Sequence, residues 1–223
     1  MLYNFFNIII LLGCLQGFIL SALLLIGPKK NLASRLLATL LFLLSLASLN
    51  IYVSESATPW QVGFVLSLVP TIILMPFGPL IYFYTRSVLD PSFRLKGKEK
   101  RQFLPVIIDV LPAIAGWILT IGYILKSFSQ NYLLQGGDII DQYNSYSDIP
   151  RWISITAYLL LTKRFLNQYQ ATSKKQERQR HRSHLGWLSF FLNSFLVFQL
   201  IWLVFLIPYI IPSFTSLAEH IFK

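Results

Sequence analysis

The feature that most constrains this chain is a series of apolar blocks, each close to the length that a helix needs to cross a bilayer. The block from Phe5 to Ile26 would extend roughly 33 Å as an α-helix, which matches the hydrocarbon thickness. Hydrophobic residues make up 55% of the 223 positions and charged residues only 13%, so a soluble core could not bury them all. The sequence therefore predicts an all-α, polytopic transmembrane helix bundle.

The blocks predict one transmembrane domain over residues 1–223 with six spans, at residues 5–26, 32–52, 62–84, 103–125, 149–166 and 185–207. The fifth span has the shortest apolar core and is supported mainly by the charges around it. Residues 214–223 have the composition of the beginning of a seventh helix, and we expect the natural chain to continue beyond Lys223.

Lys and Arg residues alternate between the two sides of this predicted topology. With six spans, sixteen of the 19 basic residues fall in the first, third and fifth connections. The positive-inside rule then places the N-terminus outside and the basic connections in the cytoplasm, where they could also contact anionic lipid headgroups. Residues 128–148 form the largest external connection, which is either an interfacial aromatic segment or a ligand-contacting loop.

Polar residues inside the apolar blocks are the candidate ligand-binding residues. Asp109 is the only carboxylate within a block, and it either binds a ligand or coupling ion or accepts hydrogen bonds from a neighbouring helix. Gln16, Asn193 and Gln199 are uncharged, and they either form hydrogen bonds between helices or contact a ligand.

Two further sets of residues indicate how the helices pack and bend. Gly13, Gly17 and Ser21 form a small-residue stripe that allows close approach of another helix, within the domain or in a homodimer. Three prolines predict kinks, and hence a hinge, in the third span; they are Pro70, Pro76 and Pro79.

The sequence gives no sign of an enzyme. It lacks the nucleophile-elbow, zinc-protease and phosphate-loop motifs, and its nine acidic residues lie mostly in connections. The three histidines have no cysteine or acidic companions at metal-binding spacing, and Cys14 is the only cysteine. We therefore expect no metal ion and no cofactor.

Several short motifs resemble one family. The stretch Gly78–Ser87 (GPLIYFYTRS), followed by Phe103-Leu104-Pro105, resembles the membrane sensor portion of bacterial AraC-type transcriptional regulators that are tethered to the membrane. Leu15-Gln16-Gly17, and Asn31 with Arg35-Leu36-Leu37, are similar to the early part of the same pattern. The resemblance implies seven spans in the bacterial inner (cytoplasmic) membrane and a cytoplasmic helix-turn-helix pair that binds DNA.

No helix-turn-helix region lies within these residues, so DNA would be a partner only through a C-terminal domain that is not present here. The resemblance implies a multi-pass sensor or signal-transducing domain whose partners are the lipid bilayer and an unknown small-molecule or lipid ligand. Two alternatives remain open from the residues alone. One is a small multi-spanning transporter that uses Asp109 as an ion or ligand site, and the other is a structural membrane subunit.

Overall fold

The computed structural model describes residues 2–27, 31–55, 72–90, 92–172 and 182–210, and every regular element in these ranges is a helix. The all-α prediction is therefore confirmed for the described residues. The chain divides into two compact units, Met1–Asn144 and Ser145–Lys223.

Four helical segments are long and apolar enough to cross a membrane, namely Phe5–Ile26, Leu32–Val53, Gly97–Ile124 and Leu185–Ile207. They coincide with four of the six predicted spans. Their large apolar side chains point outward, as at Leu12, Ile19 and Leu23, which are each about 60% exposed. A surface of this kind is unfavourable in water and is solvated by lipid chains, which identifies a helical membrane protein.

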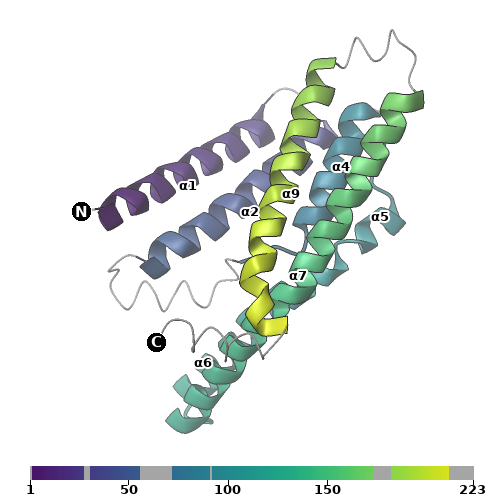
Figure 1. The fold of residues 1–223 in the computed structure, drawn as a ribbon. Helices are drawn as coiled ribbons and strands as arrows, with labels where there is room; N and C mark the ends of the chain where they lie inside the picture. Colours follow the sequence, from purple (N-terminus) through teal and green to yellow (C-terminus); the bar gives the residue numbers. More distant parts are fainter. Residues whose placement is uncertain (1, 28–30, 56–71, 91, 173–181, 211–223) are drawn as a thin grey trace. The chain divides into compact units, whose positions relative to one another are not determined.

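The first unit begins with two helices that lie side by side, α1 (Leu2–Ile26) and α2 (Leu32–Glu55) (Figure 1). Helix α2 also contacts α4 (Phe77–Leu89), whose residues are buried at nine of its 13 positions. Helix α4 is therefore the most enclosed element of this unit. By contrast, α1 has mostly outward-facing apolar side chains.

The third predicted span differs from the described structure at its proline positions. Residues 72–74 have no regular structure, Met75 and Pro76 form a turn, and α4 begins at Phe77. Pro76 is therefore the N-cap and Pro79 lies in the first turn, so neither kinks a continuous helix. Proline suits these positions because the first helical N–H groups have no acceptor within the helix. Pro70 lies outside the described residues.

Beyond α4 the chain forms a short helix α5 (Gly97–Arg101), a 3₁₀ helix η1 (Leu104–Val106) and helix α6 (Ile107–Ile124). Only residues 125–129 separate α6 from the 43-residue helix α7 (Gln130–Thr172). Lys126 takes a positive φ of 58° in this turn. The first part of α7 then runs back along α6, and the Tyr143 hydroxyl donates a hydrogen bond to the Ile108 carbonyl at 3.1 Å.

Most of residues 128–148, which were predicted to be the largest external connection, belong to helix α7. Residues 149–166 are likewise the middle of α7 and do not form a separate helix. Helix α7 is not among the four segments that are apolar enough to span a membrane. Packing explains why residues 130–148 are helical. A Cβ at Gly136 would overlap the Leu119 side chain, so this glycine permits close contact between α6 and α7.

The second unit pairs the later part of α7 with α9 (Arg182–Ile210). Hydrogen bonds from Trp152 to Gln199 and from Lys163 to Asn193 show that the two helices are antiparallel. The buried residues recur at intervals of three, four or seven residues, which places them on one face of each helix. In this unit they are Ser147, Arg151, Ile155, Leu159, Thr162 and Leu166 on α7, and on α9 they include Leu185, Leu188, Leu192, Gln199 and Leu206.

Candidate functional site

Asp109 is buried in the first turn of α6, with 4% of its surface exposed. Its Oδ2 atom accepts a hydrogen bond from the backbone N–H of Met75 at 2.6 Å. Met75 directly precedes Pro76, the N-cap of α4, so the carboxylate lies at the positive end of the α4 dipole. A buried hydrogen bond is costly to break because its donor and acceptor would lose their partner away from water, so Asp109 joins α6 to the beginning of α4.

The donor, Met75, lies in the turn before α4 and not in a neighbouring helix. Both roles predicted for Asp109, acceptance of hydrogen bonds from a neighbouring helix and binding of a ligand or ion, stay predictions. Within the described ranges, no group of three or more His, Cys, Asp or Glu side chains is arranged to hold a metal ion.

A phenylalanine cluster lies further along α4. Phe83 is fully buried, and its ring stacks on Phe93 with centroids 5.8 Å apart and an interplanar angle of 12°. The Phe103 ring lies 5.8 Å from the same ring, and the Arg86 guanidinium lies 4.4 Å from the centre of the Phe93 ring. Phe83 and Phe103 therefore bring the two main motifs of the family resemblance into contact.

Sequence reasoning missed this cluster because residues 83, 93 and 103 follow no helical or strand period. Only their aromatic character hinted at a shared core. The sequence also missed Thr85, whose hydroxyl is fully buried and has no hydrogen-bond partner among the described residues.

The small-residue stripe of α1 faces α2 over only part of its length. The Ser21 hydroxyl donates to the Ala38 carbonyl at 2.8 Å, and the Cys14 thiol donates to the Ser45 carbonyl at 3.3 Å. A Cβ at Gly17 would overlap the Ser45 hydroxyl. Gly17 and Ser21 thus serve close packing within the unit.

Gly13 lies off this interface, because an added Cβ there would meet nothing within 4 Å. Its place on the contact face is taken by Cys14, which is 1% exposed. Gln16 is exposed on α1 as well. The predicted stripe of Gly13, Gly17 and Ser21 is therefore shifted at its N-terminal end.

The two polar residues predicted on α9 both contact α7. The Gln199 carbonyl accepts from the Trp152 indole N–H at 2.8 Å, and its side-chain Oε1 accepts from the Thr156 hydroxyl at 3.1 Å. Asn193 Oδ1 accepts from the Lys163 ammonium at 3.1 Å. Hydrogen bonds between helices inside a bilayer contribute about 0.6–2 kcal/mol each. The arrangement supports a helix-joining role for both residues.

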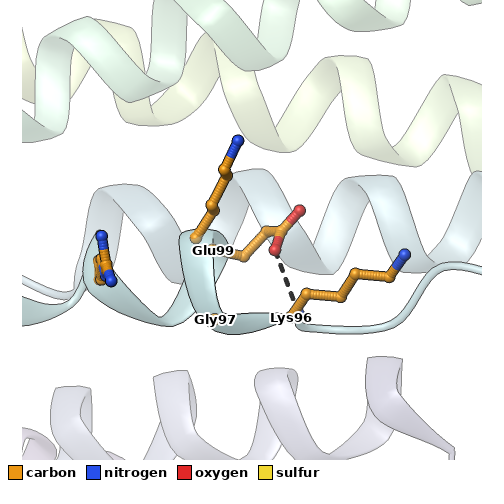
Figure 2. Close-up of a pocket in the computed structure, with 5 residues that line it drawn as sticks. Lys96, Gly97 and Glu99 are labelled. Carbon is orange, nitrogen blue, oxygen red and sulfur yellow. Dashed lines mark hydrogen bonds between the residues drawn. The ribbon is translucent and has the colours of Figure 1, made fainter.

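In the segment that connects α4 to α6 along the chain, an open pocket is lined by Lys96, Gly97, Lys98, Glu99 and Arg101 (Figure 2). The Glu99 carboxylate accepts a hydrogen bond from the backbone N–H of Lys96 at 3.1 Å, which closes the first turn of α5. The pocket is therefore a basic surface at a short helix.

No protein-family model matches the chain, and no curated protein and no solved structure matches it. The fold and its outward apolar surface define the class as a helical membrane protein. A more specific assignment rests on the motifs and contacts described above.

Proposed function

We propose that this chain is the membrane sensor domain of a membrane-tethered, AraC-type transcriptional regulator, a multi-pass protein of the bacterial inner membrane. The contact between Phe83 and Phe103 carries the proposal, because it joins the two motifs on which the resemblance rests, with ring centroids 5.8 Å apart. Residues that contact one another are constrained together, whereas chance matches in apolar sequence need not meet. DNA binding would belong to a domain beyond Lys223.

Helix α4 would be the moving element of this sensor. Its beginning is held by Asp109 of α6, and its middle is packed against Phe93 and Phe103. A cue that favours a different α4 position would break the bond between Asp109 and Met75 and shift a two-state equilibrium. The cue would be an external small molecule or a lipid.

The proposed topology has six spans and an external N-terminus, supported by the alternation of basic residues between connections. It requires residues 62–84 and 149–166 to cross the membrane in addition to the four apolar segments. Single cysteines in a Cys14→Ser background test it with an impermeant thiol reagent on intact cells. We expect labelling at Ser56 and Gly137 and protection at Gly97 and Ser173.

Gly137 is preferred to its neighbour because a Cβ there meets nothing within 4 Å, whereas one at Gly136 would overlap Leu119. Protection at both predicted external positions, or labelling at Gly97 in intact cells, would overturn the proposed orientation. Labelling of all four positions after permeabilisation is the control for access.

The regulatory function is tested by reading the coding DNA beyond codon 223. An open frame encoding two helix-turn-helix units supports the proposal, and a stop codon at that point contradicts it. In the full-length protein, Asp109→Asn should change transcription of a target promoter while the protein accumulates normally. Asn retains an acceptor oxygen for the Met75 N–H, but it removes the carboxyl group and replaces its other oxygen by an NH2 donor.

A transporter is the second candidate, and the burial of Asp109 in an apolar helix favours it. Ion-coupled uptake into proteoliposomes that is lost in Asp109→Asn would support this function. If Asp109→Asn affects only the amount of folded protein, the residue joins helices and the structural-subunit alternative gains support.

A further inference from the structure

The segment between α4 and η1 is held at both ends by aromatic contacts. Phe93 at its beginning and Phe103 at its end both lie 5.8 Å, centroid to centroid, from the buried Phe83 ring. Arg86 covers the Phe93 ring at 4.4 Å and adds a cation–π contact. The chain from residue 94 to residue 102 is therefore a short loop with two fixed ends.

This loop presents a dense positive surface. Its exposed basic side chains are Arg94, Lys96, Lys98, Lys100 and Arg101. Glu99 is the only acidic residue within the loop, and its carboxylate accepts the backbone N–H of Lys96, which fixes the α5 turn. No ion pair between Glu99 and these lysines or arginines is among the salt bridges of the described residues. The surface keeps a net excess of positive charge.

The same loop leads directly into an apolar helix. Leu104 is 68% exposed and Ile107 is 61% exposed, and both belong to the segment Gly97–Ile124 that is apolar enough to span a membrane. Lipid chains would solvate these two side chains. The basic side chains, three to ten residues before Leu104, would then lie at the level of the headgroups, with their long stems able to reach the phosphates.

We propose that residues 94–101 form a docking surface for anionic lipid headgroups, held in place by Phe93 and Phe103. The basic composition alone would permit a loose connection without a fixed position. The two ring contacts instead hold the ends of a segment of nine residues that carries five cations, three of them in α5, so several can act on the same patch of headgroups. Negative surface potential attracts each juxtamembrane cation, and the attraction adds with the number of charges.

The test uses the purified full chain in detergent with added phosphatidylglycerol or phosphatidylcholine of the same acyl chains, and native mass spectrometry counts the retained lipids. We expect a preference for phosphatidylglycerol at low salt. The variant Lys96→Gln/Lys98→Gln/Lys100→Gln should weaken this preference by about fivefold for each charge removed, with screening by detergent and salt reducing the factor. The matched Lys→Arg triple variant should retain it.

A second triple variant, Lys174→Gln/Lys175→Gln/Arg178→Gln, removes the same charge elsewhere and should have a smaller effect. An equal loss in both Gln variants would overturn a specific surface, and so would an unchanged preference in the first. If the first variant does not fold, Glu99→Gln tests the proposal instead. It raises the net positive charge of residues 94–101 and keeps an acceptor for the backbone N–H of Lys96. This variant should increase phosphatidylglycerol retention, and no increase would contradict the proposal.

Inorganic phosphate and soluble glycerol phosphate are added as competitors in separate samples. If the surface binds a lipid, these soluble anions should displace little of the retained phosphatidylglycerol, because the acyl chains of the lipid also contribute to binding. Complete displacement by either soluble anion would show an anion site without lipid dependence and would overturn the proposal.

Discussion

Substitution of Gly17 by alanine should separate packing from helix propensity at the contact between α1 and α2. A Cβ at Gly17 would overlap the Ser45 hydroxyl and would lie 3.4 Å from the Ser45 Cβ. The hydroxyl cannot turn away freely, because it donates to the Leu41 carbonyl at 2.8 Å. Either that hydrogen bond is lost or the two helices move apart, at an overpacking cost of about 1–3 kcal/mol.

Gly13→Ala is the matched control on the same helix, because an added Cβ there meets nothing within 4 Å. It should gain the usual advantage of alanine over glycine in a helix, about 0.5–1 kcal/mol. We therefore expect the unfolding free energy of Gly17→Ala to fall below that of Gly13→Ala by about 1–3 kcal/mol, the overpacking cost alone, since both gain the same propensity. The measurement is reversible unfolding in mixed micelles titrated with dodecyl sulfate and followed by far-UV circular dichroism.

A double-mutant cycle with Ser45→Ala isolates this contact, because the substitution removes the overlapping oxygen and leaves a 3.4 Å distance between the two β-carbons. In that background Gly17→Ala should lose most of its penalty, giving a coupling energy of about 1 kcal/mol or more. Equal stabilities of Gly17→Ala and Gly13→Ala would refute the close contact. A penalty that persists without the Ser45 oxygen would show that the clash lies elsewhere.

Three other predictions concern polar side chains, one without a hydrogen-bond partner among the described residues and two that are hydrogen-bonded. Thr85→Val should leave stability unchanged or raise the unfolding free energy by up to about 1–3 kcal/mol, because it removes a buried hydroxyl that has no partner among the described residues; a clear loss would contradict this. Thr156→Val should lower the unfolding free energy by roughly 0.6–2 kcal/mol through loss of the hydrogen bond to Gln199. An unchanged midpoint in the dodecyl sulfate titration would argue against that bond. The pKa of Asp90 is lowered first by the hydrogen bond from the Ser92 hydroxyl, at 2.6 Å, and then by the bond from the Ser92 backbone N–H. The contribution of Asp90 to folding stability is therefore complete above its unfolded-state pKa of about 3.9, and it is lost as pH falls through its lower folded-state pKa. The stability difference between wild type and Asp90→Asn should therefore shrink in acid, and a difference that is independent of pH would disprove the linkage.

The sequence alone predicted that lipid surrounds the apolar segments, because a bilayer places a simple constraint on the backbone. A chain in hydrocarbon must satisfy its backbone hydrogen bonds internally, so a long apolar block is a helix of predictable length. The predicted segments 5–26 and 185–207 have the same bounds as the apolar segments of α1 and α9, and the helices themselves extend up to three residues further. The rule also identified Gln199 as a polar group that needs a partner. The choice of Thr156 as the partner of the Gln199 side chain, and of the Gln199 backbone carbonyl as the acceptor for Trp152, depended on how α7 and α9 are aligned.

The remaining features were decided by tertiary contacts that leave no periodic signal. Gly13 and Gly17 have the same chemistry, but only Gly17 faces Ser45, because helix rotation about its axis depends on the whole α1–α2 interface. Residues 130–148 are polar and include two glycines, a composition that suits a loop, yet they are helical where Gly136 packs against Leu119. Asp109 was recognisable as a buried carboxylate, but its bond to Met75 required α6 to meet the beginning of α4. Apolar block length follows from the solvent alone, whereas rotation, register and pairing follow from interactions between segments that are distant in sequence.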